Sequence, residues 1–450
     1  MTLSVVILAA GKGTRMFSEK PKVLHKLSNQ PLLQYVINAA KNLNPTNINV
    51  VVGYKSDLVE QEFSKENINW VVQKEQLGTG DAVKYTASFL KGSQTIVLYG
   101  DVPLININDL KTLINISKNG LGILTFNKNN PKGYGRIKRI KKEVEGIVEE
   151  KDCSEEEKKI TEINTGIMCM DTSKLNNWLS QITNNNSQKE YYLTDIVALA
   201  KKDNIKVVTH EAKNETTISG INSKAELVSM EKFMNQKKNI ELIEQGVKIM
   251  DPSRTEIRGS LDCGSDVEID VGCIFEGIVK LGNNVKVGAY THIKDSTILN
   301  DTNIKSYSHI EASEVGENNN IGPYARLRPG VKTKKNVHIG NFVEIKNSEI
   351  GIGTKINHLS YVGDSEVGEN VNIGAGCITC NYDGVNKHKT IIEDDVFVGS
   401  NSQLVAPLTI GTGSTIGAGS TITKDTPVNQ LSLSRSKQIS IPSWERPKKK

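Results

Sequence analysis

A glycine-rich turn followed by two cations stands near the start of the chain. The turn contains Gly11 and Gly13, and Arg15 and Lys22 follow it. Glycines let the backbone turn tightly and present its N–H groups to an anion, and the cations add charge that amides lack. The stretch therefore predicts a nucleoside triphosphate site. Its spacing matches neither the Walker A loop nor the complete G-x-G-x-x-G pattern, so a tight turn with solvated cations stays the alternative.

Two further polar turns follow apolar runs. Gln73 begins a turn that continues to Gly78 and Thr79, where small residues allow a base or ribose to approach closely. Asp101 directly follows another apolar run, and a carboxylate beside a phosphate loop is a natural Mg²⁺ ligand. An ordinary turn or helix-capping role for Asp101 is the alternative.

Three later polar segments, 133–136, 147–152 and 162–166, contain Gly135, Glu149 and Asn164. A set of Glu, Asn and glycine amide groups can bind the hydroxyls of a sugar. The same segments could also be ordinary hairpin turns.

The elements that carry these residues alternate between strands and helices. Apolar runs at 3–8, 48–52, 70–72, 96–99 and 121–126 predict strands, and amphipathic segments at 32–42, 80–90 and 109–118 predict helices. This alternation indicates a largely parallel α/β sheet with ligands outside the carboxyl ends of its strands. A helix is then expected over 225–247, with Leu227, Met230, Met234, Ile240, Ile243 and Val247 on one face.

From residue 251 to about 426 aliphatic residues recur every six positions, often followed by glycine. Two of these series run Leu281, Val287, Ile293, Leu299 and Ile298, Ile304, Ile310. A hexapeptide period predicts short strands stacked as a β-helix with the aliphatic side chains inside. Segment 380–389 interrupts the period, and insertions of this kind often mark a binding face. Nearby, Arg328, Lys346, His358 and Tyr361 offer phosphate-binding cations and a general base.

Composition narrows the classes of function. The 450 residues fit two or three domains, and the net charge of +5 is scattered, with one run at Lys448–Lys450. The sequence contains no basic stripe with interleaved aromatic residues, so it gives no indication of nucleic-acid binding. It also contains no segment that resembles a membrane span or a signal peptide. We therefore expect a soluble, cytoplasmic protein with reduced thiols. Cys377 and Cys380 alone are weak support for a metal or redox site.

The motifs, taken in order, resemble those of the bacterial N-acetylglucosamine-1-phosphate uridylyltransferase/glucosamine-1-phosphate N-acetyltransferase family. Those that carry the resemblance include LAAGKGTRM, PKVLH, EQLGTG, YGDVPL, GYGRI, EINTG, GPYARLRPG, GNFVEIK, NHLSYVGD, NIGAGCITCNYDG and DDVFVGSN. The resemblance covers the whole chain. It implies acetylation of glucosamine 1-phosphate by acetyl-coenzyme A, followed by UMP transfer from UTP to N-acetylglucosamine 1-phosphate.

The resemblance also implies roles for individual residues. Those expected to bind the uridine nucleotide are Leu8, Ala9, Ala10, Gly11, Lys22, Gln73, Gly78, Thr79, Tyr99, Gly100 and Asp101, with Arg15 at the triphosphate. Gly135, Glu149, Asn164 and Asn222 are expected to bind the N-acetylglucosamine part, and Asp101 and Asn222 to hold Mg²⁺. Arg328, Lys346, Tyr361 and Asn372 are expected to bind glucosamine 1-phosphate, with His358 as the general base. Acetyl-coenzyme A is expected to contact Ala375, Asn381, Tyr382, Ser400, Ala418 and Arg435.

We accordingly predict an α/β protein with three parts. Residues 1–224 form a Rossmann-like nucleotidyltransferase domain, 225–250 a helical linker, and 251–450 a parallel β-helix with a C-terminal tail. The resemblance makes the β-helix left-handed and the protein a homotrimer with the acetyl site between subunits. The alternatives are a nucleotidyltransferase whose β-helix serves only oligomerisation or regulation, and a non-enzymatic solenoid, which the phosphate loop and Asp101 disfavour.

Overall fold

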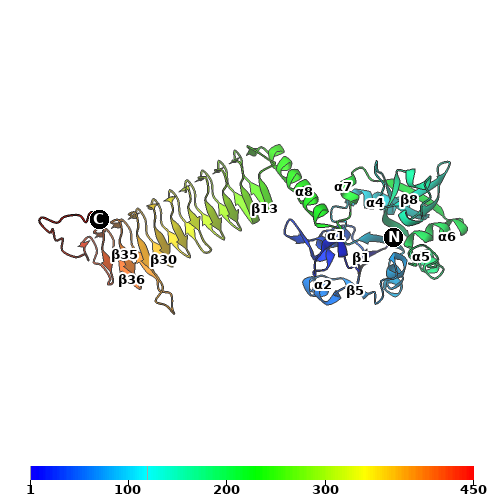
Figure 1. The fold of residues 1–450 in the computed structure, drawn as a ribbon, viewed down its shortest axis with the longest axis horizontal. Coiled ribbons are helices and arrows are strands. Elements are labelled where there is room, and N and C mark those ends of the chain that lie inside the picture. The colour runs from blue at the N-terminus through cyan, green and yellow to red at the C-terminus, as the bar shows by residue number, and fades with distance from the viewer. Residues whose placement is uncertain (1, 119, 450) are drawn as a thin grey trace. The chain divides into compact units, whose positions relative to one another are not determined.

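The computed structural model describes residues 2–118 and 120–449 and divides into two compact units, 1–232 and 233–450 (Figure 1). The first unit is an α/β domain, and the second is a solenoid of short strands. Each unit is described by itself below.

The main sheet of the first unit has the strand order β11-β7-β10-β6-β1-β4-β5. Pairing along this order is parallel except at β10, which runs antiparallel to both β6 and β7. The hairpin of β8 and β9 extends from β10. The strands are β1 (Leu3–Leu8), β4 (Asn47–Val52), β5 (Asn69–Val72), β6 (Gln94–Tyr99), β7 (Gly120–Asn127), β8 (Gly135–Ile140), β9 (Glu143–Val148), β10 (Glu162–Asp171) and β11 (Lys206–Glu211), with β2 (Lys26–Leu27) and β3 (Gln30–Pro31) paired separately.

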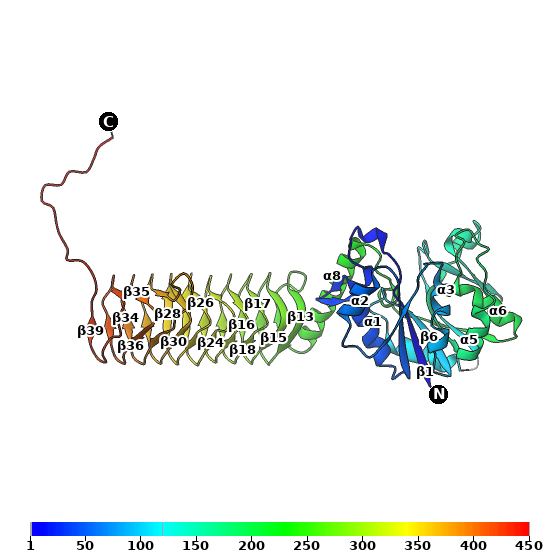
Figure 2. The same ribbon diagram turned by 90° about the horizontal axis from the view of Figure 1, so that it is seen from below.

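Helices cover both faces of this sheet, as Figure 2 shows for α1 and α2 on one side and α3, α5 and α6 on the other. The helices are α1 (Leu32–Lys41), α2 (Ser56–Glu62), α3 (Thr79–Lys84), α4 (Ile107–Ile116), α5 (Thr172–Leu179), α6 (Ile196–Lys202) and α7 (Glu215–Ile218). Successive residues of β1 supply the two cores: Val5 and Ile7 pack with α1, α2 and α4, whereas Val6 packs with α3, α5 and α6. Because β1 is buried on both faces, it shows no polar alternation in sequence.

The helix predicted over 80–90 is shorter than expected. Helix α3 ends at Lys84, and a separate 3₁₀ turn covers Ala87–Phe89. The hydroxyl of Thr86 donates to the carbonyl of Val83 at 2.7 Å. A side chain that bonds a carbonyl of the preceding turn competes with continuation of the helix.

Helix α8 (Lys224–Glu244) lies close to the predicted 225–247. Met230 and Val247 of the expected apolar set are buried, but the expectation is wrong for Ile240 and Ile243. Ile240 and Ile243 are 45% and 41% exposed, whereas Asn239 and Leu242 are buried. The Asn239 amide donates to the carbonyls of Pro252 and Thr255, which lie at the start of the solenoid. The hydrogen bonds of Asn239 to these carbonyls therefore determine which residues are buried at this end of the helix. The spacing of apolar residues alone does not predict this.

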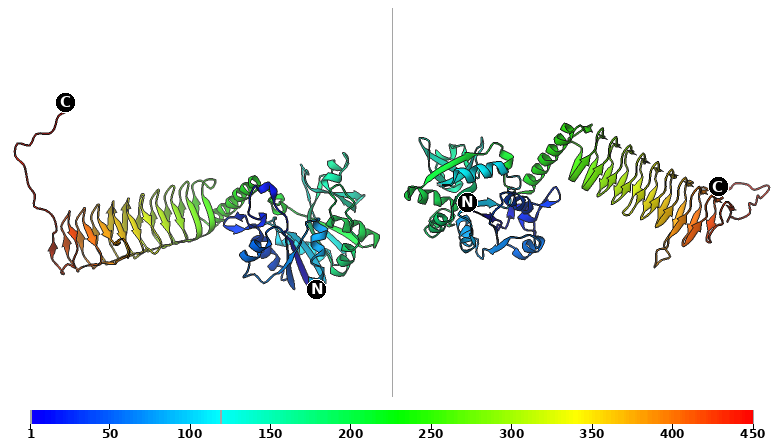
Figure 3. Two further views of the ribbon diagram at one scale, coloured as in Figure 1. Left: turned by 60° about the horizontal axis from the view of Figure 1, so that its bottom comes forward. Right: turned by 180° about the vertical axis from the view of Figure 1, so that it is seen from behind.

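The second unit is a parallel β-helix, consistent with the left-handed form expected (Figure 3). Val287 pairs with Ile304, Ile304 with Ile321, and Ile321 with Ile339, so one coil takes 17 or 18 residues. Each coil supplies one strand to each of three columns. The first column is β12 (Lys248–Ile249), β14 (Glu268–Ile269), β16 (Lys286–Val287), β19 (Asn303–Ile304), β22 (Asn320–Ile321), β25 (His338–Asn341), β28 (Lys355–His358), β31 (Asn372–Ile373), β34 (Phe397–Val398), β37 (Thr415–Ile416) and β39 (Leu431–Ser432).

The other two columns begin together, because β13 (Glu256–Cys263) and β15 (Ile274–Leu281) span both. The second column continues as β17 (His292–Lys294), β20 (His309–Glu311), β23 (Arg326–Leu327), β26 (Glu344–Lys346), β29 (Tyr361–Gly363), β32 (Ile378–Cys380), β35 (Gln403–Val405) and β38 (Thr421–Ile422). The third continues as β18 (Thr297–Ile298), β21 (Glu314–Val315), β24 (Lys332–Thr333), β27 (Glu349–Ile350), β30 (Ser365–Val367), β33 (Thr390–Ile392) and β36 (Leu408–Ile410).

The inward positions are aliphatic, as the hexapeptide period predicts, with one correction. Ile298 is buried, but Leu299, which was assigned to the same interior series as Leu281, is 45% exposed. Leu281 pairs with Ile298, only five residues beyond Ile293. A 17-residue coil has one five-residue side, and this shift turns Leu299 outward.

Segment 380–389 leaves the stack as a projecting loop, orange in Figure 1. Ile373 pairs with Val398, so this coil is longer than its neighbours, and Tyr382 and Lys387 form an antiparallel bridge inside the loop. Within the described residues, no helix is both long and apolar enough to cross a lipid bilayer.

Candidate active sites

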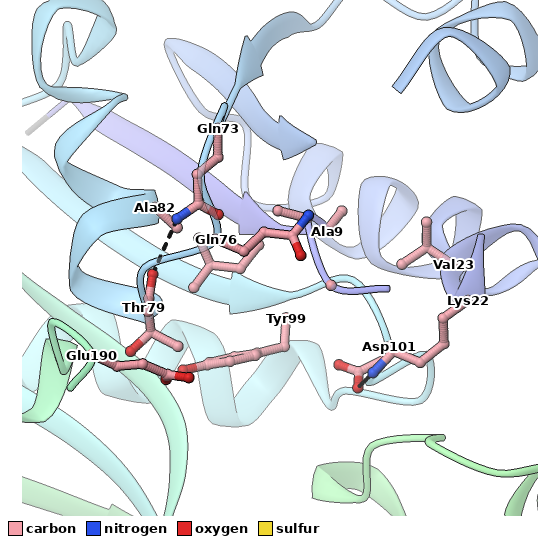
Figure 4. A pocket seen from close by; sticks show the side chains of 14 residues that line it. Ala9, Lys22, Val23, Gln73, Gln76, Thr79, Ala82, Tyr99, Asp101 and Glu190 are labelled. Atoms are coloured by element: carbon pink, nitrogen blue, oxygen red, sulfur yellow. Dashed lines mark hydrogen bonds and ion pairs between the residues drawn. The ribbon is translucent and has the colours of Figure 1, made fainter. Parts of the chain in front are cut away.

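The ends of β1, β5 and β6 surround a pocket in the first unit. Ten of its lining residues were predicted to bind nucleotide: Leu8, Ala9, Ala10, Gly11, Lys22, Gln73, Gly78, Thr79, Tyr99 and Asp101. Figure 4 shows Lys22 and Asp101 at one end of this pocket and Gln73 and Thr79 at the other. The carboxyl ends of parallel strands thus bring together turns that lie far apart in the sequence.

Lys22 connects the two predicted magnesium ligands. Its Nζ lies 2.5 Å from Oδ2 of Asp101 and 3.0 Å from Oδ1 of Asn222, and the side chains of Lys22 and Asp101 are each 14% exposed. Asp101 follows β6, whereas Asn222 lies between α7 and α8. Two oxygen atoms from separate parts of the chain therefore converge on one cation. A carboxylate and an amide oxygen facing one point fit Mg²⁺, which takes few protein ligands beside phosphate oxygens.

Gly13 lets Lys22 reach this position. Gly13 has a left-handed φ of +64°, and a Cβ there would lie 2.6 Å from Cβ of Lys22. The turn and the cation are therefore packed directly against each other. This contact gives Gly13 a steric role in addition to its conformational one.

At the opposite end of the pocket, Gln73 is buried and its Nε2 donates to Oδ2 of Asp81 at 2.7 Å. Its amide oxygen is thus the group left to accept a hydrogen bond from a base. Thr79 Oγ1 accepts from the N–H of Leu193 at 3.1 Å. These contacts fix both side chains before a nucleotide binds.

The predicted sugar-binding residues lie on β8, β10 and the end of β9. Gly135 pairs with Asn164, and a Cβ at Gly135 would lie 3.4 Å from the Glu149 carboxylate. Burial raises the pKa of Glu149, although the Thr194 hydroxyl donates to its Oε1 at 3.0 Å. Asn164 Oδ1 accepts from the N–H of Gly166, whose Cα faces the ring of Tyr99 in the nucleotide pocket. Gly135, Asn164 and Glu149 therefore lie together, and Asn164 links them to that pocket.

Two of the residues that were predicted to bind the nucleotide do not line the pocket. Arg15 is exposed on the 3₁₀ turn Thr14–Met16, and Gly100 is buried behind the pocket with its N–H donating to the Leu8 carbonyl. Sequence reasoning assigned no role to four lining residues, Val23, Gln76, Ala82 and Glu190. Gln76 lies inside the polar turn that begins at Gln73, and this was the available signal for it. Glu190 begins a polar stretch before a helix, which is a weaker signal. Val23 and Ala82 gave none, because apolar residues are expected in any turn or helix.

In the second unit, Arg328, Lys346 and Tyr361 lie on one face of the β-helix. Nη1 of Arg328 lies 2.8 Å from Oε1 of Glu344, and Glu344 pairs with Tyr361 in the ladder. Contact with Lys387 lowers the pKa of Lys346, and the charge of Arg328 adds to this effect. Lys387, from the projecting loop, is a cation that sequence reasoning had left without a role. Three cations at one place can bind a phosphate group.

His358 ends β28, at the corner between two columns of strands. Its Nδ1 lies 3.0 Å from Oδ1 of Asn341 on the preceding coil. An amide oxygen only accepts hydrogen bonds, so Nδ1 donates and Nε2 carries the free electron pair. The exposed imidazole can therefore accept a proton at Nε2. Asn341 had not been singled out in the sequence.

Residues that were predicted to contact acetyl-coenzyme A occupy the same corner on the coils that follow. Gly376 N–H donates to the His358 carbonyl, Asn401 N–H to that of Ala375, and Gly419 N–H to that of Ser400. Arg435 Nη1 donates to the carbonyl of Ala418 at 3.0 Å. His358, Ala375, Ser400, Ala418 and Arg435 therefore share one edge.

The remaining predicted residues lie apart from this edge or face. Asn381 is buried and donates to Asp364, whereas Tyr382 is exposed on the projecting loop and its hydroxyl donates to the Gly384 carbonyl. Asn372 lies on β31, in a different column of strands from Arg328, Lys346 and Tyr361. One copy of the chain does not place Asn372 on their face.

All six cysteines are free thiols, and burial raises the pKa of both Cys377 and Cys380. Within 2–118 and 120–449, no group of three or more His, Cys, Asp or Glu side chains is arranged to hold a metal ion.

Comparison with known proteins finds relatives of both units. Family models match a MobA-like NTP transferase domain at residues 5–134, a GMPPB C-terminal domain at 257–331 and six bacterial transferase hexapeptide repeats at 389–424. The chain is 53% identical over 452 residues to the bifunctional protein GlmU of Nitrosospira multiformis, covering 100% of this chain and 98% of the relative.

Two solved structures are similar to part of the chain. A putative glucose-1-phosphate thymidylyltransferase from Bacillus anthracis, in complex with a sucrose, is 19% identical with a TM-score of 0.43, covering 52% of this chain and 95% of its own. A UDP-glucose pyrophosphorylase complexed with UDP-glucose is 18% identical with a TM-score of 0.43, covering 53% of this chain and 100% of its own.

Proposed function

The chain belongs to the bifunctional GlmU family, so it is both a nucleotidyltransferase and a hexapeptide-repeat acyltransferase of cell-wall precursor synthesis, and we propose the substrates and residues of its two reactions. The β-helix unit acetylates glucosamine 1-phosphate with acetyl-coenzyme A. The α/β unit then transfers UMP from UTP to N-acetylglucosamine 1-phosphate and releases pyrophosphate. The observation that carries the second step is the convergence of Asp101 and Asn222 on the Lys22 ammonium at one end of the pocket.

In uridylyl transfer, a phosphate oxygen of the sugar attacks the α-phosphorus of UTP. Both reactants are anions, so the residues neutralise charge and align the two groups, and no protein nucleophile is required. Gln73 and Thr79 hold the uridine, and Gly135, Glu149 and Asn164 hold the sugar. Lys22 and Arg15 bind the phosphates.

Asp101 and Asn222 are the residues that would hold Mg²⁺. When bound, the ion would offset charge on the phosphate oxygens. Lys22, which contacts both residues in this structure, would supply a further positive charge to the phosphates.

In acetyl transfer, the amine of glucosamine 1-phosphate attacks the thioester carbon of acetyl-coenzyme A, the carbon–sulfur bond breaks, and coenzyme A leaves as its thiol. Arg328, Lys346 and Lys387 bind its phosphate, and Tyr361 and Asn372 complete the sugar site. A protonated amine is not a nucleophile, so His358 accepts its proton at Nε2. Acetyl-coenzyme A lies along the edge formed by Ala375, Ser400, Ala418 and Arg435. Asn381 and Tyr382, which lie apart from this edge in one copy of the chain, are further proposed contacts of the same ligand.

A homotrimer would complete this second site. Asn372 lies on a different column of strands from Arg328, Lys346 and Tyr361, so a neighbouring copy would supply it to their face. Both reactions use small cytoplasmic metabolites, and we place the enzyme in the cytoplasm. Gel filtration tests the assembly, because a monomer with full acetyl transfer would contradict a shared site.

One reaction mixture tests the assignment of activities. The protein is incubated with glucosamine 1-phosphate, acetyl-coenzyme A, UTP and Mg²⁺ while free thiol and pyrophosphate are followed separately. Thiol should appear first and pyrophosphate second. With N-acetylglucosamine 1-phosphate supplied directly for the second reaction, Asp101→Ala should abolish pyrophosphate release and keep thiol release. His358→Ala should abolish thiol release and keep pyrophosphate release from the supplied N-acetylglucosamine 1-phosphate. Loss of both activities in either folded variant would contradict two independent sites.

A further inference from the structure

Arg136 carries a buried charge beside the sugar-binding residues, and the proposed reactions do not use it. Its side chain is 2% exposed, and its Nη2 lies 2.7 Å from Oε2 of Glu150. Its Nη1 donates to the carbonyl of Tyr134, and its Nε has no hydrogen-bond partner among the described residues. A guanidinium so enclosed does not contact a substrate.

The ion pair lies where the β8–β9 ladder stops. Arg136 and Val148 are the last paired residues, so Glu149 and Glu150 follow beyond the ladder. Oε2 of Glu150 also accepts from the N–H of Gly133 at 3.1 Å. Burial opposes ionisation of Glu150, but the guanidinium and this N–H outweigh it and lower the pKa of its carboxyl.

The first two residues of β8 face the two residues that follow β9, and they do so in two pairs. Glu149 faces Gly135, with 3.4 Å between its carboxylate and the position of a Gly135 Cβ, and Glu150 binds Arg136. A shift of Glu150 along β8 would therefore carry Glu149 away from Gly135. Beyond Glu150, Asp152 accepts from the N–H of Ser187, so this short turn is held at both ends.

An ion pair between the buried Arg136 and Glu150, which is 29% exposed, adds little net stability, because desolvation of the guanidinium offsets the attraction. Its geometric effect is large. Backbone pairing between β8 and β9 ends at Val148, so the ion pair is the contact that holds the chain next to β8 at Glu149 and Glu150. We propose that the Arg136–Glu150 ion pair positions the Glu149 carboxylate for binding of the sugar phosphate. Arg136 and Glu150 are then positioning residues, and this assignment rests on the proposed sugar-binding role of Glu149.

The test compares two carboxylates that each bind an arginine of β8. Glu150→Ala removes the partner of Arg136, and the control Glu162→Ala removes the partner of Arg139, which binds Glu162 through two contacts of 2.6 Å. The KM for N-acetylglucosamine 1-phosphate, the KM for UTP and the melting temperature are measured for each. Glu150→Ala should raise the sugar-phosphate KM about tenfold, with the UTP KM and kcat within about twofold of the parent values.

Glu150→Gln distinguishes positioning from general stability. Its amide oxygen still accepts from Arg136 and Gly133, so its sugar-phosphate KM should stay close to that of the parent. If Glu150→Ala does not fold, Glu150→Asp keeps the charge but is one methylene shorter, and a rise in this KM of about threefold or more supports the proposal. An unchanged KM in the folded Ala or Asp variant, or an equal rise in Glu162→Ala, overturns it.

Glu149→Gln separates this proposal from the function on which it rests. If Glu149→Gln raises the sugar-phosphate KM and the Glu150 variants do not, the positioning role is wrong and the sugar site stands. If none of these variants changes that KM, the sugar site itself is misassigned and the positioning role is wrong with it.

Discussion

The contact between Asn341 and His358 gives a sharp test of the acetyl-transfer site. Nδ1 of His358 donates to Oδ1 of Asn341 at 3.0 Å, and both groups are accessible to solvent. Such a bond between neutral groups contributes about 1 kcal/mol net, which corresponds to about a fivefold change in rate. Asn341→Ala should therefore lower kcat for acetyl transfer about fivefold, because the imidazole loses its preferred orientation and tautomer.

Asn341→Asp tests the same contact through pH. A carboxylate about 3 Å from the imidazolium stabilises it by about 1.4 kcal/mol even at the dielectric constant of water. The acid limb of the acetyl-transfer pH–rate profile should then move to higher pH by about one unit. The profile comes from kcat measured by thiol release at saturating substrates between pH 5 and 9, a range of about four units around the histidine titration.

The matched control is Asn320→Ala. Nδ2 of Asn320 lies 3.4 Å from Nε2 of His338, an amide–imidazole contact between adjacent coils that involves neither His358 nor the cation cluster. It should leave the acetyl-transfer rate and its pH dependence unchanged, and uridylyl transfer should be unchanged in all three variants. A parental pH profile for Asn341→Asp, or equal rate losses in Asn341→Ala and Asn320→Ala, would refute the reasoning.

Three further predictions concern the glycine-rich turn, the cation cluster and a pair of stacked histidines. Gly13→Ala should lower kcat/KM for uridylyl transfer at least about tenfold, because the added Cβ would displace Lys22. The control is Gly246→Ala, since Gly246 also has a left-handed backbone but has open space around it. This control should lower only the melting temperature. Lys387→Met should raise the KM for glucosamine 1-phosphate about tenfold, whereas Lys389→Met, which removes the partner of Glu366, should not; equal effects would argue against a phosphate-binding role. Burial, followed by the charge of His309 stacked 4.9 Å away, lowers the pKa of His292, while Glu276 opposes the shift. The folded state thus favours neutral His292, so its contribution to stability is complete above about pH 6.5 and is lost as pH falls through the lower folded pKa. The melting temperature of the parent should therefore fall more steeply with decreasing pH, below about pH 6.5, than that of His292→Gln. An equal pH dependence of the two melting temperatures would contradict the prediction.

The sequence alone determined the features whose signals are local. An uninterrupted apolar run predicted β1, and six-residue spacing predicted the β-helix, because each strand places its side chains by its own period. Gly11 and Gly13 indicated a phosphate-binding turn through backbone freedom, and segment 380–389 was visible as a break in the repeat. The roles of most individual residues came from the family resemblance, because no local pattern distinguishes His358 among seven histidines.

Only the tertiary structure decided which groups meet. Lys22 contacts Asn222 across 200 positions of sequence, and Lys387 reaches Lys346 from a loop on another coil. Leu299 is exposed because one side of its coil has five residues in place of six. The burial of Asn239 on α8 follows from its hydrogen bonds to the carbonyls of Pro252 and Thr255. These outcomes depend on pairing register and on contacts between distant segments, because side-chain spacing sets the period of an element but not its partner.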